Sequence, residues 1–198
     1  MVHPAQKKAI VLVADGSEEM EAVITIDVLR RAGIQVLVLA AAAAETSAGP
    51  IVCSRGVKLV PDAYLGDDSA NIAAYDAVIV PGGAEGAATL SKNPRVCAMI
   101  ADFYAQNKLV AAICAGPLAV KAAGIQAKAA QPLSLTSHPS VKDQLEQDYI
   151  YTDGRVVVDG NLVTSRGPGT SFEFALKLVS LLVGDDKMSD VAAPMMLA

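Results

Sequence analysis

The stretch from Lys108 to Lys121 constrains this chain more than any other, because its pattern changes type within a few residues. Leu109 to Ile113 form an apolar run with the length and composition of a buried parallel strand. Cys114-Ala115-Gly116 interrupts the run, and Pro117 suits the first turn of a helix. The stretch therefore predicts Cys114 at a sharp strand-to-helix corner, flanked by small residues as in a nucleophile elbow.

A cysteine at such a corner has two chemical consequences. The helix N-terminus favours the thiolate, which predicts a thiol pKa well below its free value of about 8.5. The backbone N–H of Ala115 also points toward any oxyanion formed on a substrate that the sulfur attacks. The alternative is a small buried cysteine packed under a tight turn, since free cysteine is often part of the core. The local pattern of Cys114 leaves both interpretations open.

The rest of the chain alternates apolar runs with helical patterns, and a hairpin signal lies at Asp159-Gly160. This alternation predicts an α/β fold with a mostly parallel sheet and helices on both faces. We expect one domain over residues 1–198, with residues 1–6 as a disordered tail. Strands are predicted at Lys7 to Ala14, Ile34 to Ala40, Ile51 to Val60 (one or two short ones) and Asp76 to Val80, and helices at Ser17 to Ala32, Pro94 to Gln106 and Thr170 to Val183.

Composition excludes several classes of protein. The net charge is -5 and no basic run occurs, which argues against nucleic acid and anionic membranes as partners. No apolar stretch approaches the roughly 20 residues that span a bilayer. Three widely spaced cysteines form neither a disulfide framework nor a zinc site, so we expect a reducing compartment, the cytosol.

In parallel sheets the catalytic and ligand-binding residues lie at the carboxyl ends of the strands. Three predicted loops therefore belong together: Asp15 to Glu21, Pro81 to Gly86, and Cys114 to Pro117. The glycines in the second loop hint at a dinucleotide-binding turn, but Pro81 stands where the first glycine is needed. We interpret this loop as a source of backbone N–H groups beside Cys114.

Three glutamates, Glu18, Glu19 and Glu21, lie at the start of the first predicted helix. Acidic residues are favoured there by the helix dipole alone, so their presence needs no chemical role. Asp15 and Glu18 also have the spacing of a capping box.

The angular spacing of a helix separates these glutamates. Glu19 falls on the arc of Asp27 and Arg30, which predicts a solvated side chain. Glu21 falls on the opposite, apolar side, where burial raises the pKa of a carboxyl and lets it shuttle a proton to a cysteine. Glu18 also points inward, so the choice between Glu18 and Glu21 stays open.

The chain has two histidines, and His3 lies in the N-terminal tail. An imidazole partner for Cys114 is therefore expected to be His138, although a loop histidine without any role is a real alternative. His138 does not begin a His-x-Glu motif, which argues against a protease-type or glutaminase-type triad.

The chain resembles the ThiJ/PfpI superfamily and, within it, the parkinsonism-associated protein-deglycase branch (the DJ-one proteins). The resemblance covers nearly the whole chain, and its motifs occur in order and are highly specific. The matching motifs are Ala14 to Glu21, Val28 to Gly33, Cys53 to Arg55, Val80 to Gly83, Ala111 to Pro117, His138-Pro139 and Thr164 to Ala175.

The resemblance implies a flavodoxin-like sandwich that forms a homodimer partly through its first helix. It implies a nucleophile, Cys114, with a protonated partner, Glu21, and a nearby histidine, His138. It further implies oxyanion or substrate binding by the backbone at three positions, and dimer-facing residues near the site at three others. These positions are Gly82, Gly83 and Ala115, and Arg55, Glu18 and Arg31, respectively.

The leading functional hypothesis is an enzyme without cofactor or metal that acts on reactive dicarbonyls such as methylglyoxal and on glycated proteins. In this scheme Cys114 attacks the aldehyde carbon and Glu21, together with His138, moves a proton between adjacent carbons. The alternative is a non-enzymatic redox sensor or chaperone in which Cys114 is oxidised to a sulfinate. Family members are described in both ways.

Overall fold

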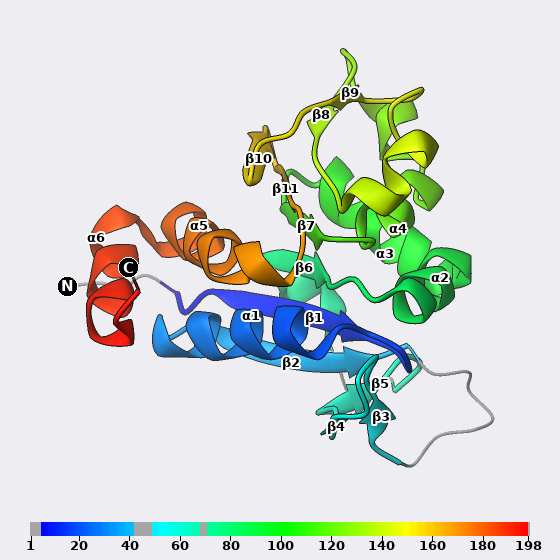
Figure 1. The fold of residues 1–198 in the computed structure, drawn as a ribbon. Coiled ribbons are helices and arrows are strands. Elements are labelled where there is room, and N and C mark those ends of the chain that lie inside the picture. The colour runs from blue at the N-terminus through cyan, green and yellow to red at the C-terminus, as the bar shows by residue number, and fades with distance from the viewer. Residues whose placement is uncertain (1–4, 42–48, 68–70, 198) are drawn as a thin grey trace.

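A sheet of seven strands runs through the middle of the computed structural model, which describes residues 5–41, 49–67 and 71–197 (Figure 1). Neighbouring strands are parallel except for one antiparallel hairpin at the edge of the sheet. This architecture confirms the predicted mostly parallel α/β fold. In sheet order the strands are β10 (Val156–Asp159), β11 (Leu162–Ser165), β7 (Leu109–Ile113), β6 (Ala77–Val80), β1 (Lys8–Val13), β2 (Gln35–Ala40) and β5 (Ala63–Tyr64).

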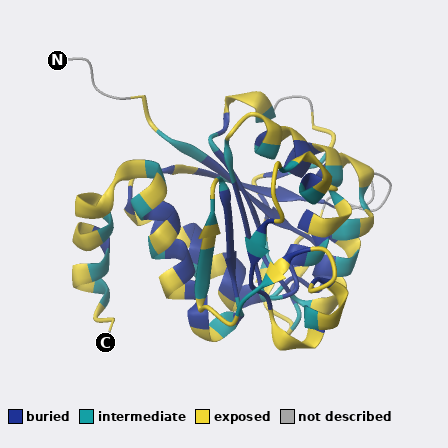
Figure 2. Cartoon of the chain, turned by 90° about the horizontal axis from the view of Figure 1, so that it is seen from above, coloured by how far each residue is buried: buried dark blue, intermediate teal, exposed yellow. Residues whose placement is uncertain are grey.

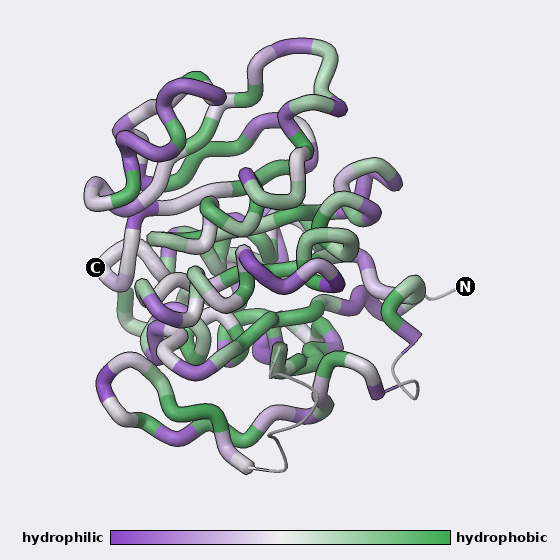
Figure 3. The backbone as a smooth tube through the Cα atoms, turned by 90° about the vertical axis from the view of Figure 1, so that its right-hand side faces the viewer, coloured by the Kyte–Doolittle hydropathy of each residue, from purple (hydrophilic) through white to green (hydrophobic). Residues whose placement is uncertain are grey.

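The central strands are apolar on both faces because both faces are covered. In β1, Ile10 and Leu12 belong to one hydrophobic cluster, while Val11 and Val13 belong to the cluster on the other face. The sequences of such strands are continuous apolar runs and do not alternate between apolar and polar residues. Figure 3 shows these hydrophobic tracts passing through the centre of the molecule.

Helices cover the two faces as separate layers (Figure 1). On one face α1 (Glu19–Arg31) packs beside α5 (Ser171–Val183), and α6 (Asp185–Ala192) packs on α5. The other face is covered by α2 (Ala84–Lys92), α3 (Pro94–Ala105) and α4 (Pro117–Ala122). Figure 2 shows the buried residues in the sheet and along the inward sides of these helices.

Two local predictions can be compared with the structure outside the central strands. The hairpin signal at Asp159-Gly160 is confirmed, since β10 and β11 pair with Asp159 opposite Leu162. The predicted short strands after Ile51 form the antiparallel pair β3 (Ile51–Val52) and β4 (Lys58–Leu59). A further small parallel pair, β8 (Ser134–Leu135) and β9 (Ile150–Tyr151), precedes the hairpin.

Two local predictions are wrong and one is tested only in part. Asp15 does not cap α1: its carboxylate accepts from the N–H of Val52, and Glu18 is the N-cap instead. The loop predicted from Pro81 to Gly86 ends early, because α2 begins at Ala84. Residues 1–4 of the predicted tail lie outside the described residues, whereas the Gln6 side chain donates to the carbonyl of Gly33.

Candidate active site

Cys114 lies at a strand-to-helix corner, as predicted. It follows the last residue of β7 and has a φ of 63°, a left-handed conformation that residues other than glycine rarely adopt. Its backbone is fixed on both sides: its N–H donates to Ser165 O (3.0 Å), and its carbonyl accepts from His138 N (2.9 Å). These bonds to distant segments hold a conformation that costs of order 1–3 kcal/mol.

Gly82, in the loop that follows β6, lies wedged between the loops that follow β1 and β7. A Cβ at this position would lie 2.5 Å from Cys114 Cβ, 2.7 Å from Glu21 Oε2 and 2.9 Å from the backbone N of Ala115. Its N–H donates to Glu21 Oε2 (2.7 Å), and its carbonyl accepts from Glu18 N (3.0 Å). Only glycine fits here, so the three predicted loops do meet at one point.

Glu21 is the carboxyl that reaches the cysteine. Its side chain is fully buried, and Oε1 has no hydrogen-bond partner among the described residues. Burial raises the pKa of Glu21 to about 7, with a smaller contribution from the charge of Glu18, although the Gly82 N–H and Cys114 oppose the shift. A carboxyl of this kind exchanges its proton readily near neutral pH.

The predicted lowering of the Cys114 thiol pKa is wrong. Burial and the neighbouring Glu21 carboxylate raise the pKa of Cys114 to about 12, and the N–H groups of Gly83 and Ala115 only partly offset them. The helix that follows, α4, has six residues, so its dipole is weak. Two negative charges repel each other in this buried corner, so the pair keeps one proton and the thiolate forms when Glu21 holds it.

Backbone N–H groups provide a place for negative charge beside the sulfur. Those of Gly83 and Ala115 bond to the Cys114 sulfur and favour its ionised form. Gly83 is the N-cap of α2 with a φ of 85°, and a Cβ there would lie 2.7 Å from the backbone N of Glu18. Close backbone approach therefore requires glycine at this position too.

His138 lies at the rim of the same cavity and is exposed. Its ring contacts its own segment rather than a carboxylate: Nδ1 lies 2.8 Å from Ser140 Oγ and 3.2 Å from Ser140 N. No acidic side chain among the described residues hydrogen-bonds to the ring. This arrangement agrees with the interpretation against a protease-type triad.

A cavity of about 470 Å³ opens over the cysteine, bordered by the start of α1, the β3–β4 hairpin and the segment after β8. It is much larger than a three-carbon substrate. Its lining includes six of the nine predicted site residues: Cys114, His138, Gly83, Ala115, Glu18 and Arg55.

Arg31 is the one predicted site residue that lies elsewhere. It is in the last turn of α1, where Nε bonds to Asp27 Oδ2 at 2.6 Å. The cavity beside it is formed with residues of α6 and the segment after it, including Lys187 and Val191. The length of α1 therefore separates Arg31 from the cysteine.

Glu19 has a structural role that the sequence analysis missed. Its side chain was predicted to be solvated, but it is 7% exposed. Oε2 accepts from Ser54 Oγ and Oε1 from Arg55 N, both at 2.8 Å. Helical angles alone cannot reveal this, because the β3–β4 hairpin covers a face of α1 that would otherwise meet water.

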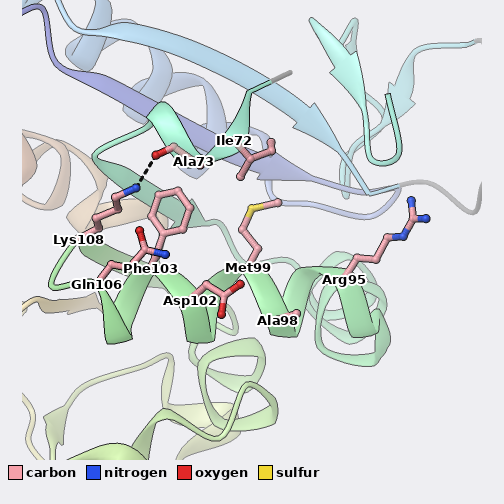
Figure 4. A pocket seen from close by; sticks show the side chains of 9 residues that line it. All are labelled: Ile72, Ala73, Arg95, Ala98, Met99, Asp102, Phe103, Gln106 and Lys108. Atoms are coloured by element: carbon pink, nitrogen blue, oxygen red, sulfur yellow. Dashed lines mark hydrogen bonds between the residues drawn. The ribbon is translucent and has the colours of Figure 1, made fainter. Parts of the chain in front are cut away.

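A second cavity, of about 350 Å³, lies between α3 and the segment before β6 (Figure 4). Lys108 closes one part of it, donating to Ala73 O at 2.6 Å and lying 5.1 Å from the centre of the Phe103 ring. Neither cysteine nor histidine is among the residues that line it. The chemical features described above therefore concentrate in the Cys114 cavity.

Metal-ligand clusters and membrane-spanning helices are both absent from the described residues. These residues contain no group of three or more His, Cys, Asp or Glu side chains arranged to hold a metal ion. Within the same part of the chain, no helix is long and apolar enough to cross a bilayer.

Comparison with known proteins gives consistent matches along the chain. Residues 7–181 match the DJ-1/PfpI family. The Parkinson disease protein 7 homolog of Danio rerio is 46% identical, and the glutathione-independent glyoxalase DJR-1.2 of Caenorhabditis elegans 39%, each over 98% of both chains. The crystal structure of Drosophila melanogaster DJ-1beta superposes with a TM-score of 0.88 at 41% identity, covering 98% of this chain and 99% of that one.

Proposed function

This chain belongs to the DJ-1/PfpI family, and from that premise we propose that it is a glutathione-independent glyoxalase that needs no cofactor. The observation that carries the proposal is the pair of half-buried Cys114 and fully buried Glu21, which holds one exchangeable proton under a cavity with two oxyanion donors. A nucleophile and a proton carrier side by side are what the conversion of a dicarbonyl to a hydroxy acid requires.

The reaction follows from the positions of these groups. The Cys114 thiolate adds to the aldehyde carbon of methylglyoxal, and the N–H groups of Gly83 and Ala115 stabilise the oxyanion until it takes the proton of Glu21. The Glu21 carboxylate then removes the remaining C–H proton from that carbon and returns it to the neighbouring carbon, while the hydroxyl proton of the first carbon passes to the oxygen of the neighbouring carbon. The product is a thioester on Cys114, which water hydrolyses to lactate and the free thiol.

We extend the proposal to early adducts of dicarbonyls on proteins, that is, to protein deglycase activity. The cavity volume of about 470 Å³ leaves room for a side chain that carries the adduct. Glu18 and Arg55 line the same cavity and offer one charge of each sign to such a side chain.

We also propose that the protein is a homodimer that uses the outer face of α1. Met20 and Val23 on this helix are about half exposed, as are Val52 and Val57 on the β3–β4 hairpin. The hydrogen bond from Ser54 to Glu19 places that hairpin against the start of α1. Apolar side chains grouped in this way are typical of an interface, and sedimentation at several protein concentrations tests for it.

The decisive experiment measures lactate formed from methylglyoxal in thiol-free buffer by the wild type, Cys114→Ser and Cys97→Ser. Cys97 is the matched control, because it lies on α3 and donates to Ser91 O. We expect the Cys114 variant to lose at least about 10³-fold in kcat/KM and the control to keep its activity.

The amount of product distinguishes an enzyme from a non-enzymatic redox sensor. Product that never exceeds one equivalent per protein would reject the enzyme and favour a sensor function. Intact-mass measurement after mild peroxide would then show whether Cys114 alone gains two oxygens, as the sulfinate requires.

A further inference from the structure

The imidazole of His138 is held on one side by a residue with no assigned role. Ser140 places two groups at Nδ1: its backbone N–H at 3.2 Å and its hydroxyl oxygen at 2.8 Å. A backbone N–H can only donate, so Nδ1 must offer its lone pair. A neutral imidazole that accepts at Nδ1 carries its proton at Nε2.

The backbone of His138 is fixed independently of the ring. Its N–H donates to the carbonyl of Cys114, and its own carbonyl accepts from Val141 N (3.1 Å) and Ser137 Oγ (3.0 Å). Only the two side-chain torsions are left to set the ring, and Ser140 restrains both. The position of the ring is thereby tied to the nucleophile through one hydrogen bond.

This arrangement is the reverse of the one that makes histidine a strong base. In such triads Nδ1–H donates to a carboxylate, which leaves Nε2 free to accept a proton. Here Nδ1 is the acceptor, and no carboxylate among the described residues bonds to the ring. The remaining nitrogen is therefore a donor when it meets a substrate.

We propose that His138 acts in the reaction as a neutral Nε2–H hydrogen-bond donor to the substrate, and that Ser140 is the positioning residue that sets this tautomer. A dicarbonyl has two oxygens. The N–H groups of Gly83 and Ala115 serve the oxygen on the attacked carbon. His138 serves the oxygen on the neighbouring carbon, which gains negative charge while Glu21 moves the proton. This inference rests on the proposed function and assigns separate hydrogen-bond donors to the two substrate oxygens.

The first test observes the ring directly and needs no activity. His3→Gln leaves His138 as the one histidine of the chain, so ¹⁵N-histidine spectra report its tautomer without overlap. At a pH where the ring is neutral, we expect Nε2 protonated and Nδ1 unprotonated. Ser140→Ala removes the hydroxyl but keeps the backbone N–H at Nδ1, so we expect the Nδ1 resonance to shift while the tautomer stays the same. Ser140→Thr should keep the original spectrum. A ring protonated at Nδ1, or a spectrum unchanged in Ser140→Ala, overturns the proposal.

The second test separates a donor from a base by side-chain mimicry. The amide of His138→Gln can donate from the place of Nε2, whereas His138→Asn and His138→Ala cannot. We expect the Gln variant to stay within about 10-fold of wild-type kcat and the other two to lose about 10²-fold. Equal losses in all three variants would show that the ring works as a base and reject the proposal.

The role of Ser140 is read from kcat and KM together. Ser140→Ala is expected to lower kcat about 3- to 10-fold with little change in KM, and Ser140→Thr to restore it. Ser91→Ala is the matched control, because that hydroxyl bonds within α2, away from the cavity. Absence of lactate in the wild type would reject the proposed function alone, since the tautomer is measured separately.

Discussion

Glu19 and Glu21 lie two residues apart on the same helix, and both are buried, yet their surroundings give them opposite properties. Burial by itself raises the pKa of the Glu19 carboxyl, but hydrogen bonds from its own N–H, Ser54 and Arg55 outweigh it and lower the pKa. Glu21 has a single backbone donor, Gly82, and burial raises its pKa to about 7.

The difference shows that burial alone does not decide whether a carboxyl is ionised. A buried carboxylate with enough donors stays ionised and stabilises the fold, whereas one with few donors holds its proton and becomes available for chemistry. Glu19 accordingly fixes the β3–β4 hairpin, and Glu21 faces the nucleophile. Three experiments test this difference between Glu19 and Glu21.

The largest expected difference is in turnover. Glu21→Gln keeps the size of the side chain but removes the exchangeable proton, so kcat/KM should fall about 10²- to 10⁴-fold. Glu19→Gln should lower it by no more than about threefold, because Glu19 acts on the fold and not on the substrate. Losses of equal size in the two variants, measured as lactate formation, would contradict the division between them.

The next difference is in the pH dependence of stability. The folded-state pKa of Glu21 lies above its ordinary value of 4.5, so its contribution to stability is lost as pH rises from about 4.5 to about 7. Near pH 8, Glu21→Gln should therefore be more stable than wild type by about 3 kcal/mol, and the two should converge near pH 4.5. Urea unfolding at both pH values measures this, and repeating it with Cys114→Ser present removes the titration of the thiol.

The smallest expected effect is on the stability of Glu19→Gln, which should be lower than that of wild type, whereas that of Glu21→Gln should be higher. The pKa of Glu19 is lowered, so its contribution to stability is present above 4.5 and is lost as pH falls through the folded-state value. Glu19→Gln should cost about 1–2 kcal/mol near neutral pH, and less in acid. A variant as stable as wild type at neutral pH would show that the hydrogen bonds from Ser54 and Arg55 contribute nothing net.

Several parts of the site followed from short stretches of sequence. The apolar run before Cys114, the small residues after it and Pro117 are enough to predict the corner, because strand, turn and helix signals act over a few residues. The gathering of three loops followed from parallel strand order, since β1, β6 and β7 are adjacent. The family resemblance selected Glu21 over Glu18, a choice that helical angles left open.

The alternation of strands and helices and the place of the cysteine could be predicted from the sequence, because local patterns encode them. The ionisation of the carboxyl groups near the cysteine depends instead on how the chain packs in three dimensions. Burial raises the pKa of Glu21 against the opposing contacts of Gly82 and Cys114, and Glu19 accepts a hydrogen bond from Ser54. Each of these partners is more than 30 positions away along the chain. Burial and hydrogen-bond partners of this kind come from packing, which no periodicity along the chain records.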